Sequence, residues 1–148
     1  MANTQSMCTS FLGEVLTATH NFGTAPVRAA TTADTFKAAL YLTTATVNAS
    51  TTAYSTTGEV TNTSGSGYTA GGTTVTNGTA PTATNSSSTA GTAYWTPTAS
   101  FSWSALTVTT AFDAVLVYNS TQSNKAVSVH TFGSQTITAG TFTLTMPS

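Results

Sequence analysis

Apolar side chains recur at every second position in several segments of this chain, and this period constrains the fold more than any other feature. Residues 35–42 and 141–146 follow it, and the apolar positions concerned are Phe36, Ala38, Leu40, Leu42, Phe142, Leu144 and Met146. Successive side chains of a β-strand point to opposite faces, whereas a helix repeats its apolar positions every 3.6 residues. The pattern therefore predicts β-strands with one apolar face.

The second half of the chain reads as a series of such strands. Residues 112–118 are apolar almost throughout, which predicts a central strand covered on both faces. Residues 119–124 resemble a hairpin connection into a further strand at 125–131. Gly133 and Gly140 then separate two more short strands.

A change of phase interrupts the strand that begins at Phe101. Phe101 and Trp103 share one face, but Leu106 and Val108 fall out of step with them, which predicts a β-bulge. Many short strands with turns about 8 to 12 residues apart are typical of an all-β protein, an antiparallel β-sandwich or barrel. The 148 residues fit a single domain.

The first half gives weaker signals. Residues 6–12 could form one or two helical turns that end at Gly13, and residues 14–19 read as a strand. Residues 47–92 are rich in Thr, Ser, Gly and Asn, and we expect long, irregular but mostly ordered loops with a short strand at 73–76. The loops would be anchored by single large side chains, namely Tyr54, Val60 and Tyr68, and residues 85–91 would be the most mobile piece.

Charge is scarce, and this excludes several kinds of partner. Only 5% of the residues are charged, whereas 38 are threonine. The three cations, Arg28, Lys37 and Lys125, are too few and too scattered to neutralise the phosphates of a nucleic acid. No apolar run approaches the roughly 18 to 20 residues of a membrane span. Residues 1–5 show no sign of a secretory signal, so we expect a chain that is made and used without that route.

Candidates for catalysis or metal binding are equally few. The four carboxylates, Glu14, Asp34, Glu59 and Asp113, stand apart in the sequence, and His20 and His130 have no spacing that suggests a metal site. Serines are abundant but lack a nucleophile elbow, and the glycine pair at 71–72 lacks the lysine of a phosphate loop and is better explained as a tight turn. The single Cys8 is expected to be a small buried hydrophobe. We therefore predict no enzyme, no cofactor and no metal.

Large aromatic side chains in the Gly- and Thr-rich loops are the better candidates for function. Tyr68, Tyr94 and Trp95 lie there, where an aromatic ring has less reason to belong to the core than one on a regular strand. We predict these three residues as interface anchors. Tyr94, Trp95 and Trp103 could instead stack on sugar rings.

Five motifs in this order carry a resemblance to a known family. They are DTFKAALY at 34–41, TGEV at 57–60, GYTAGG at 67–72, FDAVLVY at 112–118 and GTFTLTMP at 140–147. The series resembles a family of small virion structural proteins of tailed bacteriophages, and it spans nearly the whole chain. The resemblance implies a particle component and carries over no catalytic residue.

The resemblance and the scarcity of charge together suggest a capsid cement or decoration protein. Such a chain would be made in the host cytoplasm, bind the major capsid protein on the exterior of the virion, and associate with copies of itself, with a trimer as one possibility. It would act by mass action, because a protein that binds only the assembled lattice shifts the equilibrium toward that lattice. The alternatives are a tail, collar or fibre subunit of the particle, or a carbohydrate- or receptor-binding module.

Overall fold

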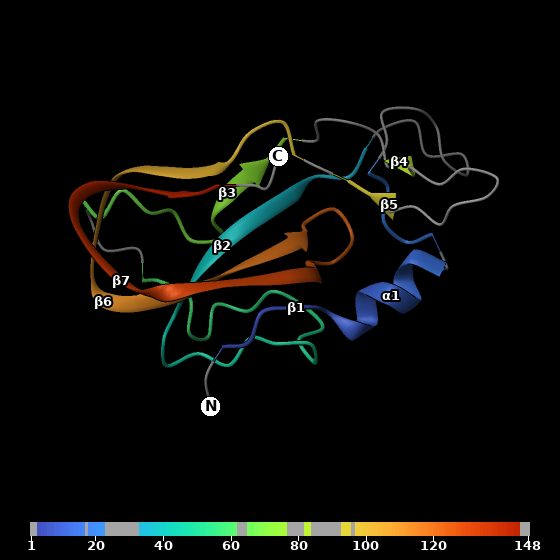
Figure 1. Cartoon of the computed structure of the whole chain (residues 1–148), viewed down its shortest axis with the longest axis horizontal. Coiled ribbons are helices and arrows are strands. Elements are labelled where there is room, and N and C mark those ends of the chain that lie inside the picture. Colours follow the sequence, from blue (N-terminus) through green and yellow to red (C-terminus); the bar gives the residue numbers. More distant parts are fainter. Residues whose placement is uncertain are drawn as a thin grey trace.

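The computed structural model describes residues 3–16, 18–22, 33–61, 65–76, 82–83, 93–95 and 97–145. These residues form a mainly antiparallel β-structure with one short helix (Figure 1). The main sheet has five strands in the order β1-β7-β6-β2-β3, and a separate two-stranded sheet pairs β4 with β5. Their bounds are β1 Ser6–Met7, β2 Phe36–Leu42, β3 Thr73–Val75, β4 Thr82–Ala83, β5 Ala93–Tyr94, β6 Phe101–Asn119 and β7 Lys125–Leu144. The predicted all-β class is confirmed.

The strand predicted to be central lies in the middle of the main sheet. Residues 112–119 of β6 pair with β2 on one side and with β7 on the other. Residues 114 to 117 of β6 are at most 2% exposed, as a strand covered on both faces should be. The predicted strand at 36–42 is also confirmed, although it is buried on both faces and not on one.

The β6–β7 hairpin is long and strongly bent, and in Figure 1 both strands curve at the left of the view and return above β2. Five register shifts interrupt its pairing. One lies between Trp103 and Leu106, where Ala105 has a positive φ of 53°, so the predicted bulge is confirmed. Gly133 and Gly140 do not divide the end of the chain into separate strands, because β7 runs through both and adjusts its register by bulges.

The N-terminal prediction is partly wrong. The helix α1 spans Thr9–Leu16, so Gly13 lies inside it and residues 14–16 are helical, not extended. Ala18 takes a φ of 49°, and its N–H and that of Thr19 bond back to the carbonyls of Val15 and Glu14. This is a Schellman ending in which alanine holds the left-handed position that glycine usually takes. Within the described residues, no helix has the length and apolar character to cross a membrane.

Aromatic rings fill the space inside the bend of the hairpin. Phe142 contacts Phe112, Phe132 and Trp103, with ring centroids 4.8 to 5.8 Å apart. Edge-to-face and tilted contacts of this kind add to the stabilisation from burial alone. The two halves of the bent hairpin are thereby held together by apolar contacts as well as by their backbone pairing.

Candidate functional site

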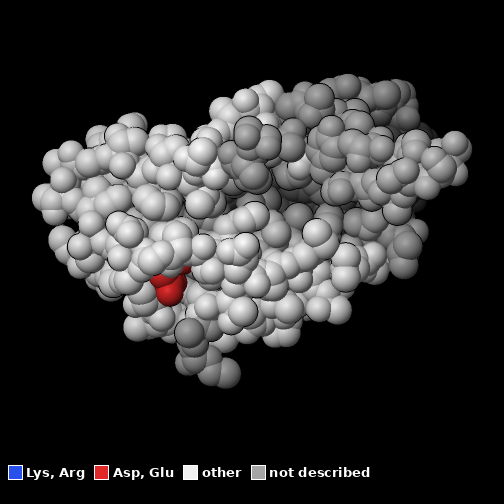
Figure 2. All heavy atoms as spheres, in the orientation of Figure 1, with Lys and Arg blue, Asp and Glu red and all other residues white. Residues whose placement is uncertain are grey.

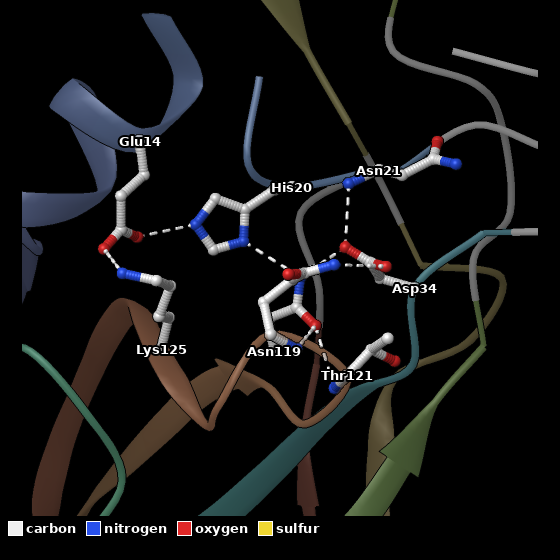
Figure 3. Close-up of polar contacts among 8 residues, drawn as sticks. Glu14, His20, Asn21, Asp34, Asn119, Thr121 and Lys125 are labelled. Carbon is white, nitrogen blue, oxygen red and sulfur yellow. Dashed lines mark hydrogen bonds and ion pairs between the residues drawn. The ribbon is translucent and has the colours of Figure 1, made fainter. Parts of the chain in front are cut away.

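A chain of polar contacts joins residues that are far apart in the sequence (Figure 3). The Lys125 ammonium lies 2.6 Å from Oε1 of Glu14, and Oε2 of Glu14 lies 2.7 Å from Nε2 of His20. On its other side, Nδ1 of His20 lies 3.0 Å from the amide nitrogen of Asn119. That nitrogen also donates to Asp34 over 2.7 Å. Four of the residues that had seemed isolated in the sequence are thus brought together.

The orientation of the Asn119 side chain determines which ring nitrogen of His20 carries the proton. Its Oδ1 accepts hydrogen bonds from the backbone N–H groups of Thr121 and Gln122 at the hairpin turn, so its amide nitrogen must face His20. An amide nitrogen only donates, and Nδ1 of His20 must therefore accept. The proton of the neutral ring is then on Nε2, where it is donated to Glu14.

The geometry of the His20 cluster indicates a structural role. The side chain of His20 is fully buried and Asn119 is 0% exposed, and both ring nitrogens of His20 have a protein partner. A general base needs a nitrogen within reach of a substrate proton, and this ring presents none. The contacts instead tie α1 to the hairpin turn and to the start of β2.

The electrostatics of Glu14 agree with a structural role. Burial raises the pKa of its carboxyl. The hydrogen bonds from Lys125 and His20 lower the pKa by more than burial raises it, so the net pKa lies below its usual range. Glu14 is consequently ionised in the folded protein at neutral pH. Its ion pair with Lys125 contributes a contact between α1 and β7.

A second polar cluster centres on the carboxylate of Glu59, which is only 6% exposed. Its Oε1 accepts from the Tyr68 hydroxyl over 2.6 Å and from the N–H of Gly71 over 2.7 Å, and its Oε2 accepts from the Tyr54 hydroxyl over 2.6 Å. The Tyr68 oxygen in turn accepts from the N–H of Leu40 in β2. Burial and the neighbouring Glu59 raise the pKa of both tyrosines above its usual range. These hydroxyls remain protonated and available as donors.

The turn at 67–72 depends on this cluster and on its glycines. Tyr118 donates its hydroxyl to the carbonyl of Gly71, which adds a bond from β6 to the one that Glu59 makes. Gly72 has a φ of 73°, and a Cβ at this position would lie 1.8 Å from the carbonyl oxygen of Ala38. The predicted tight turn with close backbone approach is confirmed. Four of the five motifs that carried the resemblance therefore supply groups to the same buried assembly.

Two of the three predicted interface residues contribute to the interior. Tyr68 is 2% exposed, so its prediction as a surface anchor is wrong for this fold: its ring is folded into the core and its hydroxyl is used by Glu59. Trp95 is half-buried and packs on Phe22 and Phe36, with ring centroids 4.7 and 5.3 Å away. Tyr94 lies in β5, and its side chain is outside the described residues. The mobile piece predicted at 85–91 is outside them as well.

The other residues that could act as nucleophiles or metal ligands are not arranged as a catalytic or metal site in the described part of the chain. Ser128 Oγ lies 3.0 Å from Nε2 of His130, and burial lowers the pKa of that histidine, but the part of the chain that the structure describes supplies no carboxylate hydrogen bond to orient the ring. Cys8 is fully buried as predicted, and burial with the nearby Glu14 raises its pKa to about 11, so it stays a thiol. No group of three potential metal ligands occurs among the described residues.

The surface carries little charge within the described ranges, and the hollow beside β3 is small. Asp34 and Glu59 are buried and Glu14 pairs with Lys125, while Figure 2 shows a face with one small acidic area and no basic one. A hollow of about 180 Å³ beside β3 is lined largely by threonine and serine, and it is smaller than the ~300–1,000 Å³ of typical ligand sites. Large apolar side chains are exposed at the N-terminal end, namely Met7, Leu12 and Val15.

The cluster around His20 could not be found from sequence spacing, because its contacts join residues up to 111 positions apart. The Glu59 carboxylate binds groups 5 to 12 positions away, but the bond from Tyr118 to the same turn spans 47 positions. One feature of the sequence points to the Glu59 cluster, namely a lone acidic residue followed by the glycine-rich turn at 67–72.

Comparisons with family models, with curated proteins and with solved structures give no match to this chain.

Proposed function

We propose that this chain is a structural protein of a phage particle, a cement or decoration protein that binds the outer face of the major capsid protein shell. It would have no catalytic role. The proposal rests on the order of the five sequence motifs and, from the structure, on one observation: most of the few charged side chains that the structure describes are engaged with other groups of the same chain. What remains for a partner is a surface of hydroxyl, amide and apolar groups.

The contacts of five of the charged side chains support this reasoning. Glu59 and Asp34 are buried and fully hydrogen-bonded, Glu14 and Lys125 neutralise each other, and Asp113 accepts a bond from the side chain of Asn3. A surface with so little net charge neither steers a charged ligand nor repels further copies of the protein. Contacts made from hydroxyl and apolar groups lose little in salt, which suits permanent attachment to a shell.

The mechanism would be thermodynamic linkage. A protein that binds the assembled lattice, and not the free capsid subunits, stabilises the lattice by RT ln(1 + [L]/Kd), about 2.7 kcal/mol per site when its concentration is a hundred times Kd. The bound protein would thereby resist pressure from packaged DNA. A rigid β-framework suits this task, since little ordering is needed on binding.

The alternatives receive no specific support. A sugar-binding platform made from Trp95 and Trp103 would need exposed ring faces, but Trp103 is 5% exposed and Trp95 packs on Phe22 and Phe36. A tail, collar or fibre subunit would share the surface properties described above, and the copy number distinguishes it.

Addition of the purified protein to capsid shells that lack it tests the proposal. We expect saturable binding that survives a wash in molar salt and that raises the temperature at which the shells open. Shells that fail to bind the protein, or that bind it only at low salt, would contradict the proposed role. Shells of an unrelated phage serve as the control for non-specific adhesion.

A further inference from the structure

The outer edge of β7 is the longest unpaired strand edge that the structure describes. One neighbour of β7 is β6, and the other is β1, which covers only Ser128 and Val129. From residue 131 to residue 144, none of the described segments adds backbone pairing on the side away from β6. The opposite edge of the sheet, β3, is only three residues long. Unpaired N–H and C=O groups on a long edge are a template for another strand.

This edge lacks most of the devices that keep sheet edges from pairing. Residues 131–144 contain no charged side chain and no proline, although Lys and Pro are the usual protection. Bulges are present, since the register shifts at several points along the hairpin. They end before the last stretch, where Phe142, Thr143 and Leu144 pair with β6 in unbroken register.

The side chains of residues 141–144 alternate between the two faces of the sheet. Phe142 and Leu144 turn toward the core, whereas Thr141 and Thr143 are exposed on the opposite face. A strand that added to this edge would continue both faces of the sheet. Threonine pairs across neighbouring strands are among the favourable ones, because their hydroxyls can bond one another.

We propose that this edge pairs with the same edge of a second copy of the chain, antiparallel and about a two-fold axis, to give a dimer joined through β7. The absence of charge along this edge favours a second copy of the chain as the partner. Two identical edges meet without like-charge repulsion only if they are uncharged, as residues 131–144 are. The whole chain has a formal net charge of only -1, so little repulsion opposes the approach of two copies.

Such pairing is isologous and uses up the edge in both copies, so it closes at the dimer. The inference goes beyond the proposed function, because the contact is between copies of the chain and needs no shell. The two can therefore fail separately: the dimer is measured in the isolated protein, and shell binding is measured on particles.

Sedimentation equilibrium of the purified full-length protein tests the inference. We expect the wild type to dimerise with rising concentration and the Thr141→Lys/Thr143→Lys variant to dimerise at least tenfold more weakly, because like charges would face each other across the axis. Thr56→Lys/Thr57→Lys, which makes the same change of charge at two exposed loop positions, should dimerise as the wild type does. A mixture of the lysine edge variant with Thr141→Glu/Thr143→Glu should recover association.

Several results would overturn the inference. They are a wild type that stays monomeric, a trimer, an edge variant that dimerises normally, or a loop variant that loses dimerisation to the same extent. Hydrogen exchange on the wild type provides a test without substitutions. The amides at 140–144 should become more protected as concentration rises, and unchanged exchange there would locate the contact elsewhere or deny it.

Discussion

The hydroxyl of Tyr68 offers the sharpest test of how this fold is stabilised. It donates to the buried carboxylate of Glu59 and accepts from the N–H of Leu40, and Tyr68→Phe removes both bonds while keeping the ring. A hydrogen bond to a charged group contributes about 1.5–3 kcal/mol, and a buried donor left without a partner costs about 1–3 kcal/mol. Because such terms are not fully additive, we expect a loss of about 2–4 kcal/mol in the free energy of unfolding.

Tyr54→Phe is the matched control for this measurement. Tyr54 donates to the other oxygen of the same carboxylate and stacks on Tyr118, but it is only half-buried. Water can replace its hydroxyl, and the phenylalanine ring can keep the stack, so the expected loss is only about 0.5–1.5 kcal/mol.

Urea unfolding followed by tryptophan fluorescence would measure both variants, with the slope of the transition used to confirm that the folded states are comparable. Equal losses for the two variants would refute the reasoning that burial decides the value of these bonds. A loss below about 1 kcal/mol for Tyr68→Phe would show that the Glu59 cluster does not stabilise the fold as we describe.

Three further predictions concern the core and the N-terminal helix. Leu116→Ala should lower the free energy of unfolding by about 2–5 kcal/mol, because this side chain is fully buried in the central strand; an unchanged melting temperature would argue against that placement. Trp95→Ala should cost about 1–3 kcal/mol in the same measurement, less than a fully buried tryptophan, and no change would mean that its packing against the core is unimportant. Since the pKa of Glu14 is lowered by folding, its contribution should be complete above about pH 5 and decline as the pH falls through its folded-state pKa. The difference in stability between wild type and Glu14→Gln should therefore shrink in acid, and a pH-independent difference would contradict this.

The sequence predicted the β-strands well because their determinants are local. The period of two at β2 and the apolar run in β6 reflect direct contact with the core on each face, and the shift of phase near Ala105 corresponds to a bulge. Turn chemistry was also readable, as the glycines at 71–72 show.

The errors have physical causes as well. A helix end was expected at Gly13, but the helix ends by placing Ala18 in a left-handed conformation, which a single sequence does not reveal. Tyr68 was expected both to anchor its loop and to contact a partner at the surface. The loop folds against β2 and buries the ring, so Tyr68 anchors the loop and is not a surface contact. The His20 cluster joins distant segments, and so do the bonds that tie the Glu59 cluster to β2 and β6; no spacing rule connects such residues.

The number of copies of this chain per particle tests the central claim most directly. Quantitative mass spectrometry of purified particles, with the major capsid protein as internal reference, gives this number before and after a wash in molar salt. A cement protein should be present in hundreds of copies, in fixed proportion to the major capsid protein, and should stay attached through the wash. A few copies per particle would indicate a tail, collar or fibre subunit, and quantitative loss in salt would contradict an interface made from uncharged groups.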